Sequence, residues 1–383
     1  MTALRDLRLI CLAPDTVVPP ANGSAARTMG LAAAVRPYLA GVAIHSFSPT
    51  PQPPHGVTGL DVVHLPVPTG GLARARYLAV ALLGPALGFR FQDRIDGPRT
   101  LVQLESPLLF EAAHRAGLRR FVLDAHNVYQ DMTAFPQASL RDRIFYRVTR
   151  RRQARMETAC WAQAAHVIFC SPVDRDRAER LLPGLAGKST IVPNCVDAGA
   201  FVPRPASTFR RGGPVLFMGT TRYPPNFFAI QEICRDVAPA LPDLEFEVVG
   251  DAGWAPALVP PNVRFLGRVE STARPLANAQ VAVAPVRHGS GTRLKLLEYF
   301  AAGLPVVCTP KAAEGLDVED GRHLRLVETP AEMVAAVRAL HGDPVACAAL
   351  GAAARALVEE RYDWRAQVPR LLAIYTNHAR GES

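Results

Sequence analysis

The stretch Val286-Arg-His-Gly-Ser-Gly-Thr-Arg-Leu-Lys-Leu-Leu-Glu298 joins a glycine-rich loop to the start of a predicted helix. It follows the apolar run 281–284, which predicts a buried strand. Glycines let the backbone approach a ligand closely, and Thr292 is a suitable residue for the helix N-cap. Because the first turn of a helix has unpaired N–H groups and a positive dipole end, the stretch favours binding of an anion such as a diphosphate.

Two cations and a carboxylate follow these glycines. Arg293 and Lys295 fall in the predicted first turn, where a cation opposes the helix dipole at a cost of roughly a few tenths of a kcal/mol. Their presence there indicates a bound anion, while Glu298, near the same helix face as Lys295, is suited to accept hydrogen bonds from ribose hydroxyls. The alternative is an ordinary capped helix with solvated charges, but that leaves the helix stop and buried strand at 303–307 unexplained.

Short apolar runs alternate with helical patterns along the whole chain, which predicts parallel sheets covered by helices on both faces. In the first half we expect strands at 7–12, 42–46, 62–65, 101–104, 121–123 and 167–170, with helices at 25–38, 108–116 and 140–165. In the second half we expect strands at 215–218, 246–249, 263–266, 281–284, 306–308 and 324–327, with helices at 227–241, 293–302 and 330–341.

A Pro/Gly-rich stretch at 191–214 separates the two halves and marks the domain boundary. We therefore expect an α/β protein of two doubly wound, Rossmann-like domains, residues 1–200 and 201–365, facing each other across a cleft. The segment 366–383 is predicted to be a helix that packs back on the first domain. In open α/β sheets ligands bind at the carboxyl ends of the strands, which would open into that cleft.

The composition is that of a folded protein with anionic partners. The 383 residues are 49% hydrophobic and 20% charged, with a formal net charge of +9. The seven cysteines are scattered and form no C-x-x-C pair, so we expect buried, reduced thiols. The start lacks a signal-peptide pattern, and the apolar stretch 77–89 is shorter than the roughly 20 residues of a membrane span. These features favour a cytoplasmic protein, and a peripheral position on the inner face of the membrane stays open.

The sequence resembles family 4 of the retaining nucleotide-sugar glycosyltransferases, the glycosyl transferases group 1, which have the GT-B fold. The resemblance rests on Gly289-Ser-Gly-Thr-Arg-Leu-Lys-Leu-Leu-Glu298, on Gly303-Leu-Pro-Val-Val307 and on Pro193-Asn-Cys-Val-Asp197. It extends over nearly all of the C-terminal half through the segments 216–219, 225–226, 265–268, 313–315 and 362–364.

The resemblance implies roles for residues of the donor site. Glu298 matches the family's second motif glutamate, which binds the donor ribose, whereas Ser290 stands where the family has its first motif glutamate. After Gly219 the family often has Arg and Lys, but this chain has Thr-Thr-Arg222. Diphosphate binding is therefore expected from the loop and helix start, Gly291 to Lys295, together with Arg222. In this prediction the donor-binding residues are Gly23, Arg222, Gly291, Thr292, Arg293, Lys295 and Glu298.

The N-terminal half carries the candidates for sugar transfer. His126 follows the apolar run 121–123 and matches the histidine that the family places beside the donor sugar, which makes it the candidate catalytic residue. Asn22-Gly23 resembles the family's first-strand loop, whose backbone amides approach the sugar or the diphosphate; the alternative is an ordinary turn before a helix. Glu105 and Asn127 are weaker candidates for contacts on the acceptor side.

No metal and no cofactor is expected. Asp174-Arg-Asp176 has the Asp-x-Asp spacing of metal-dependent transferases, but it lies inside a predicted helix and we interpret it as surface. Arg and Lys side chains would neutralise the leaving diphosphate instead. The arginine-rich helix 140–165 is interpreted as a solvated basic face, with docking on anionic lipid as the alternative.

The expected activity is transfer of a sugar from a nucleotide diphosphate to a glycan, lipid-linked or small-molecule acceptor, with retention of anomeric configuration. UDP is the preferred nucleotide and GDP the alternative. Two other functions stay open: a nucleotide-sugar epimerase or hydrolase on the same fold, and a basic nucleic-acid-binding protein. The second has little support, because no recognised module interleaves aromatic residues with the arginines. We therefore expect no nucleic-acid partner.

Overall fold

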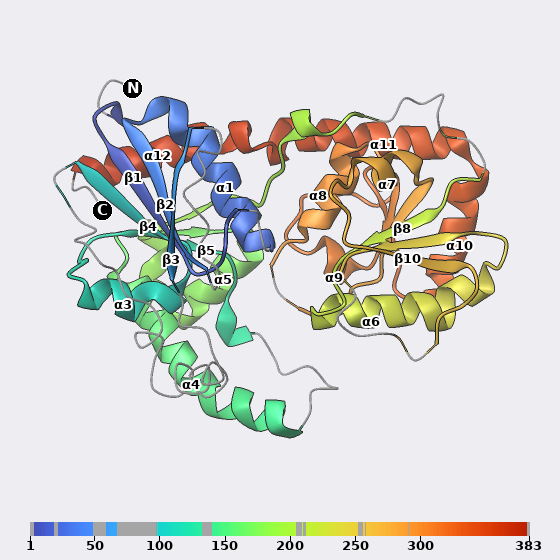
Figure 1. The fold of residues 1–383 in the computed structure, drawn as a ribbon, viewed down its shortest axis with the longest axis horizontal. Coiled ribbons are helices and arrows are strands. Elements are labelled where there is room, and N and C mark those ends of the chain that lie inside the picture. The colour runs from blue at the N-terminus through green and yellow to red at the C-terminus, as the bar shows by residue number, and fades with distance from the viewer. Residues whose placement is uncertain are drawn as a thin grey trace. The chain divides into compact units, whose positions relative to one another are not determined.

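The computed structural model describes residues 4–18, 22–48, 59–66, 97, 99–131, 140–203, 209, 212–251, 256, 258–289 and 291–380. The chain divides into two compact units (Figure 1). The N-terminal unit comprises Met1–Asn194 together with Gln367–Ser383, and the C-terminal unit comprises Cys195–Ala366. The C-terminal segment of the chain thus belongs to the N-terminal unit.

The described part of the N-terminal unit contains a seven-stranded parallel sheet in the order β3-β2-β1-β4-β5-β6-β7. Its strands are β1 (Arg8–Ala13), β2 (Gly41–Ser48), β3 (Asp61–Pro66), β4 (Thr100–Leu104), β5 (Val122–Ala125), β6 (His166–Phe169) and β7 (Ser189–Ile191). Its helices are α1 (Gly23–Val35), α3 (Phe110–Arg115), α4 (Leu140–Gln163), α5 (Pro172–Leu181) and α12 (Val368–Arg380).

Alternation along the strands decides which residues face which helices. Leu104 and Phe169, with other side chains of the same alternation, join one hydrophobic cluster with Phe110 of α3 and Trp161 of α4. The opposite alternation carries Gln103 and Asp124 toward α1 and α12. In Figure 1, α12 runs beside α1, and the two helices pack together. The sheet is therefore covered on both faces, and polar side chains near the ends of its central strands lie beneath α1 and α12.

The described part of the C-terminal unit contains a six-stranded parallel sheet in the order β10-β9-β8-β11-β12-β13. Its strands are β8 (Val215–Met218), β9 (Phe246–Val249), β10 (Val263–Gly267), β11 (Val281–Ala284), β12 (Val306–Cys308) and β13 (Arg325–Leu326). Its helices are α6 (Pro224–Glu232), α7 (Ala273–Asn278), α8 (Leu294–Ala301), α9 (Pro310–Ala313), α10 (Pro330–Gly342) and α11 (Pro344–Leu357). All four residues of β11 are buried, as the apolar run 281–284 predicts.

Most predicted elements are present, but the helix at 227–241 differs in form, and strand β7 and helices α7, α9 and α11 were not predicted. The helix expected at 227–241 begins earlier, at Pro224, and passes into a π turn at Ile233–Val237 and a 3-10 turn at Ala238–Ala240. Pro239 has no N–H to donate to the preceding turn, so regular helix cannot continue through it. Strand β7 was not expected because its three residues are only half-buried and include two polar ones.

All seven cysteines are buried and free, as predicted. Within the described residues, no single helix has the length and apolar character needed to cross a membrane. The pair Pro330–Gly342 and Pro344–Tyr362 meets those criteria only when joined, and it is bent by 103°. The apolar stretch 77–89 lies outside the described residues.

Candidate functional site

In the C-terminal unit, the strand order reverses between β8 and β11. From β8 the sheet continues through β9 to β10 on one side, and from β11 it continues through β12 to β13 on the other. Ligands of open α/β sheets bind at the carboxyl ends of the strands beside such a reversal, where the connecting loops diverge. Gly219 follows β8 and the glycine loop 285–293 follows β11. The topology therefore brings both predicted donor-binding segments to one place.

Lys295 lies at the carboxyl end of β8, where Gly219 leaves room for it. A Cβ on Gly219 would be 2.6 Å from Asn226 Nδ2 and 2.7 Å from Lys295 Nζ. The ammonium group donates a hydrogen bond to Asn226 Oδ1 at 2.7 Å and lies 4.1 Å from the centroid of the Phe217 ring. Asn226 is fixed in turn, because its Nδ2 donates to the Thr220 carbonyl at 3.1 Å. The cation is thus held in place, and no carboxylate of the described residues lies at hydrogen-bonding distance from it.

Burial disfavours the charged forms of both ionisable groups on this part of α8. The pKa of Lys295 is lowered to about 7. Burial is the largest cause, the nearby charge of Arg293 also lowers this pKa, and the charge of Glu298 raises it. Burial raises the pKa of Glu298 to about 7, against the charge of Lys295. An anion placed beside Lys295 would favour its charged form. The environment of this lysine is therefore suited to receive a negative group.

Helix α8 begins later than the sequence predicts. Its first residue is Leu294, Arg293 occupies the N-cap position, and no side chain caps the helix, so the prediction of Thr292 as N-cap is wrong. Arg293 has an extended backbone, and its guanidinium folds back to donate to the carbonyls of Gly291 and His288, each at 3.0 Å. Arg293 therefore shapes the glycine loop while carrying its positive charge to the start of α8.

The glycine loop requires glycine at two positions. Gly289 has φ of 101° and Gly291 has φ of 75°, both in the left-handed region that side chains rarely adopt. A Cβ on Gly289 would also lie 3.0 Å from an Arg293 nitrogen. Thr292 is buried beside this loop, and Ser290 lies outside the described residues.

The other donor-side candidates differ in how they are engaged. Arg222 is exposed, and its Nε donates to Asp251 Oδ2 at 2.6 Å, so its charge already has a partner. Glu298 lies one turn after Lys295 on α8 and is half-buried; within the described residues no hydrogen bond reaches its carboxylate. Lys295 and Glu298 are therefore the better-placed pair for a ligand at this site.

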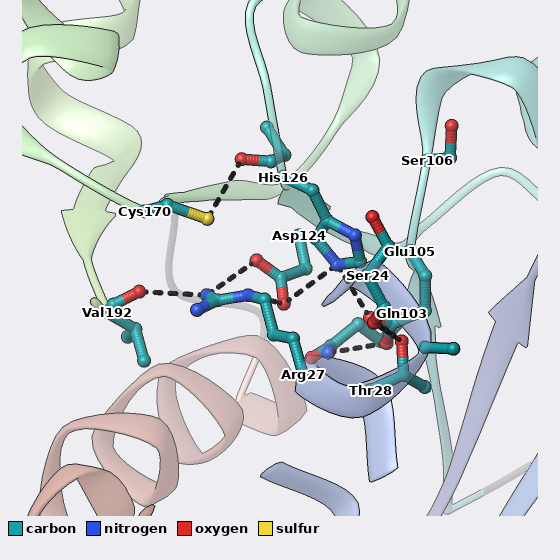
Figure 2. Close-up of polar contacts among 12 residues, drawn as sticks. Ser24, Arg27, Thr28, Gln103, Glu105, Ser106, Asp124, His126, Cys170 and Val192 are labelled. Carbon is teal, nitrogen blue, oxygen red and sulfur yellow. Dashed lines mark hydrogen bonds and ion pairs between the residues drawn. The ribbon is translucent and has the colours of Figure 1, made fainter. Parts of the chain in front are cut away.

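In the N-terminal unit, His126 lies directly after β5 in a buried polar cluster (Figure 2). Its side chain is 7% exposed. Its Nε2 lies 3.2 Å from Glu105 Oε2 and 3.5 Å from Asp124 Oδ2. Glu105 follows β4, the neighbour of β5, so the parallel register carries both carboxylates to the histidine.

Arg27 of α1 neutralises one of these carboxylates. Its Nε and Nη2 donate to Asp124 Oδ2 and Oδ1 at 2.8 and 2.9 Å, a bidentate ion pair that Figure 2 shows beside His126. Its remaining N–H groups donate to the carbonyls of Val192 and Pro193 at 2.8 and 2.9 Å and to Asn194 Oδ1 at 3.1 Å. Arg27 therefore ties Asp124 to the last residues of the unit before the chain leaves it.

The carboxylate of Glu105 is fully engaged inside the protein. Its Oε1 accepts from Gln103 Nε2 at 2.8 Å and its Oε2 accepts from Thr28 Oγ1 at 2.9 Å. Gln103 is held by Tyr375 of α12, whose hydroxyl donates to Gln103 Oε1 at 2.8 Å. Glu105 is 1% exposed, so the structure places this acceptor-side candidate beside His126 rather than at the surface.

The charges of this cluster stabilise one another. Burial by itself lowers the pKa of His126, but the charge of Asp124 and hydrogen bonds to Asp124 and Glu105 raise that pKa to about 9. Burial would raise the pKa of Asp124, but the charges of Arg27 and His126 lower it to about 2. Close opposite charges outweigh the cost of burial in both cases.

Glu105, Asp124 and His126 also form a group in which one ligand atom from each lies within 4.8 Å of the others, a spacing that fits a metal ion. The hydrogen bonds argue against that use. Both oxygens of Asp124 accept from Arg27, and both oxygens of Glu105 accept from neighbouring side chains. The guanidinium takes the place of a cation, so these residues as arranged do not fit a metal.

The interpretation of Asp174 as a surface residue is wrong. Asp174 is 2% exposed, and its Oδ2 accepts from the hydroxyl of Ser171, the N-cap residue of α5, at 2.7 Å. Asp176 is exposed and pairs with the adjacent Arg175. The cause is local, because a carboxylate in the first turn of a helix folds back toward the N-cap. The two residues form no joint site.

Gly23 and Asn127 occupy the expected strand-end regions. Gly23 is the exposed first residue of α1, where Asn22 Oδ1 accepts from the Ala25 amide at 3.0 Å. The preceding residues 19–21 lie outside the described residues. Asn127 is half-buried directly after His126.

Sequence reasoning missed Arg27, Thr28 and Gln103 as parts of the His126 cluster and gave Asp124 no role. One signal was available for Arg27, since it lies on a helix whose other buried residues are almost all apolar. An arginine on a buried helix face needs an acidic partner. The identity of that partner was not deducible, because Asp124 is 97 residues away.

Comparison with known proteins matches part of the C-terminal unit to a family. Residues 214–343 match the family model described as glycosyl transferases group 1. A GDP-mannose-dependent monoacylated alpha-(1-6)-phosphatidylinositol monomannoside mannosyltransferase of Corynebacterium glutamicum is 32% identical over 166 residues, or 38% of this chain and 42% of that protein. The chain spans about half the length of the curated relatives it matches.

Solved structures match the fold of nearly the whole chain. Sucrose-phosphate synthase from Thermosynechococcus elongatus has a TM-score of 0.72 at 17% identity, covering 98% of this chain and 100% of that one. Anabaena HepE, in complex with UDP and glucose, has a TM-score of 0.64 at 15% identity, covering 96% and 99%. At these identities the likeness concerns the fold alone.

Two doubly wound units, one with a glycine loop and a half-buried lysine where its strand order reverses, define a protein of the GT-B fold, and that prediction is confirmed. Residues 214–343 match the model of the glycosyl transferases group 1, the family that the motifs of this segment resemble. Membership of family 4 and retention of configuration stay predictions.

Proposed function

We propose that this chain is a glycosyltransferase that moves a sugar from a nucleotide diphosphate to a hydroxyl of a glycan, lipid-linked or small-molecule acceptor. The observation that carries the proposal is the placement of Lys295. Its ammonium lies at the strand-order reversal of the unit that matches the glycosyltransferase family, beside a glycine that keeps the space open. If the ammonium of Lys295 were paired with a carboxylate, its charge would serve the stability of the fold. Its hydrogen-bond partner is instead the neutral side chain of Asn226.

In the proposed reaction, the bond from the anomeric carbon to the diphosphate breaks and negative charge accumulates on the leaving phosphate oxygen. Lys295, Arg293 and the N-terminal end of α8 stabilise that charge, so neither metal nor cofactor is required. Glu298 accepts hydrogen bonds from the ribose. The acceptor attacks from the leaving-group face with retention, and its proton passes to the departing phosphate oxygen. His126 contacts the transferred sugar.

The nucleotide and the acceptor are open in this proposal. The name of the Corynebacterium relative specifies GDP-mannose and a phosphatidylinositol-based acceptor, which supports a guanine nucleotide and a lipid-linked acceptor. The Anabaena structure contains UDP, the nucleotide preferred from the sequence. The seven free thiols support a cytoplasmic location.

Titration calorimetry with UDP, GDP and their sugar conjugates tests the site. We expect one nucleotide diphosphate to bind, and Glu298→Gln to weaken it, because the amide loses the charge that favours hydrogen bonds from ribose hydroxyls. A second assay follows nucleotide release with and without candidate acceptors. Release that depends on an acceptor supports transfer, whereas equal release without acceptor indicates a hydrolase. Binding of neither nucleotide would refute the proposed donor.

A further inference from the structure

The hydrogen bonds around His126 specify what its ring can do. Both oxygens of Asp124 accept from Arg27, and Oε1 of Glu105 accepts from Gln103. The single hydroxyl proton of Thr28 lies between two acceptors, Glu105 Oε2 at 2.9 Å and the Ser24 carbonyl at 3.1 Å. As carboxylates, Asp124 and Glu105 act only as acceptors. Nε2 of His126 lies 3.2 Å from Glu105 Oε2 and must therefore be the donor. The ring is either the neutral form protonated at Nε2 or the imidazolium ion.

The charges that face the ring distinguish these two forms. Arg27 reaches the cluster from α1, Glu105 from the end of β4 and Asp124 from β5. Three further titratable groups of the N-terminal unit border the carboxylates: Cys11 on β1, Cys170 after β6 and Tyr375 on α12. Burial raises the pKa of all three well above its ordinary value, so they carry no charge at neutral pH.

The described cluster thus contains two carboxylates and one permanent cation. With a neutral histidine it would hold an uncompensated negative charge in a site that is almost fully buried, which is unfavourable. A proton on His126 balances the charge. The raised pKa of His126, about 9, agrees with this count.

We propose that Glu105 is a positioning residue that, together with the Arg27-bound Asp124, holds His126 as an imidazolium ion whose Nδ1–H donates to an oxygen of the substrate. The ring is more than nine-tenths buried, and within the described residues no hydrogen bond engages Nδ1. The hydrogen bond from Nδ1–H to the substrate rests on the proposed function, whereas the positive charge of His126 does not.

The consequence for the reaction is that His126 is a hydrogen-bond donor and a positive charge, and not a general base. A doubly protonated ring has no lone pair with which to take the acceptor's proton. The proton therefore passes to the departing phosphate oxygen, as the proposed reaction requires. Glu105, predicted from the sequence to bind an acceptor hydroxyl, acts through His126 instead.

The test is nitrogen-15 NMR of the full chain labelled in histidine, without ligand, with the His126 signal assigned by its loss in His126→Gln. We expect both ring nitrogens to be protonated at pH 7.5 in the wild type. In Glu105→Gln, which removes the charge but keeps the shape, the titration midpoint should fall by about one pH unit or more. Thr28→Val is the matched control: it removes a hydrogen bond to the same carboxylate without changing charge, and its midpoint should stay unchanged.

A neutral ring in the wild type at pH 7.5 overturns the inference, and this measurement does not depend on whether Glu105→Gln folds. If Glu105→Gln folds and the midpoint of the His126 titration is unchanged, Glu105 does not hold His126 in its charged form. The second measurement is the dependence of kcat on pH. As the pH rises and His126 loses its proton, kcat should fall, and in Glu105→Gln this fall should begin at a lower pH than in the wild type. The KM for the donor should be the same in both proteins. If no sugar is transferred at any pH, the proposed function fails while the NMR result still decides the charge state.

Discussion

At the scale of single residues, the surroundings of two basic side chains move their charge equilibria in opposite directions. Lys295 is half-buried near a second cation, so its pKa falls to about 7. His126 is buried between two carboxylates, so its pKa rises to about 9. From residue type alone, a lysine is charged at neutral pH and a histidine titrates close to it. Here the environment places the pKa of the lysine near neutral pH and the pKa of the histidine well above it. The consequence is that Lys295 responds to an anionic ligand near neutral pH while His126 keeps its proton.

Replacing Lys295 with methionine should weaken binding of the nucleotide diphosphate by about 10- to 100-fold, the range for loss of a charge-assisted hydrogen bond. Because the pKa of Lys295 is about 7 in the free protein, binding at pH 8 should take up a proton. Calorimetry in buffers of different ionisation enthalpy measures both quantities, and the uptake should be lost in Lys295→Met.

Arg338→Met is the control for Lys295→Met. It also removes a positive charge from the C-terminal unit, but Arg338 pairs with Asp243 just before β9, at the opposite ends of the strands. Arg338→Met should bind the nucleotide diphosphate with the affinity of the wild type. If both variants weaken binding equally, the effect is one of net charge and Lys295 has no specific contact with the ligand.

At the scale of elements, α8 connects the proposed donor site to the core of the C-terminal unit. One side of the helix presents Lys295 and Glu298, while Leu296, Leu297 and Phe300 are buried. The Tyr299 hydroxyl accepts from the Met218 amide at 2.7 Å, which fixes α8 to the end of β8. The two proposed donor-binding side chains are therefore positioned by packing as well as by the glycine loop.

The contact of α11 with the end of α8 provides a test of this packing. A Cβ on Gly351 of α11 would lie 2.0 Å from the carbonyl oxygen of Gly303, so Gly351→Ala must displace backbone. We expect a loss of about 1–3 kcal/mol in the free energy of unfolding, measured by urea denaturation. Gly342→Ala is the control, since its Cβ would meet nothing within 4 Å. Equal stability of Gly351→Ala and the wild type would contradict the close contact.

At the scale of the whole molecule, the two units place their buried ionisable groups so that stability responds to pH in opposite senses. The pKa of His126 is raised from 6.5 to about 9, so its contribution is complete below pH 6.5 and is lost as the pH rises through 9. The pKa of Lys295 is lowered from 10.5 to about 7, so its unfavourable contribution diminishes as the pH rises above 7.

Urea denaturation at pH 6.5 and pH 9 of the wild type, His126→Gln and Lys295→Met separates these contributions. When the pH is raised from 6.5 to 9, His126→Gln should lose less stability than the wild type, because this variant has no stabilising charge of His126 to lose. Lys295→Met should lose more, because the compensating gain is absent. The same pH response in all three proteins would show that neither pKa is shifted on folding.

Much of the fold was predictable because it depends on local patterns. The apolar runs at 281–284 and 306–308 are buried strands β11 and β12, and the predicted glycine-rich connection from strand to helix lies between β11 and α8. The placement of Lys295 and Glu298 on one helix was predictable because it follows from their spacing alone. A strand of weak pattern, β7, was not predictable, since it depends on pairing with β6.

The sequence by itself determined most of the strands, the longer helices, the glycine loop and the match of residues 214–343 to a family model, because hydrophobic periodicity, glycine conformations and motif spacing are properties of neighbouring residues. Only the tertiary structure decided the state of His126. Arg27 lies 97 residues from Asp124, and Tyr375 lies 272 residues from Gln103. Such pairs are brought together by the order of strands in the sheet and by the return of α12 to the N-terminal unit. Their charges interact strongly because the packed interior excludes the water that would otherwise screen them.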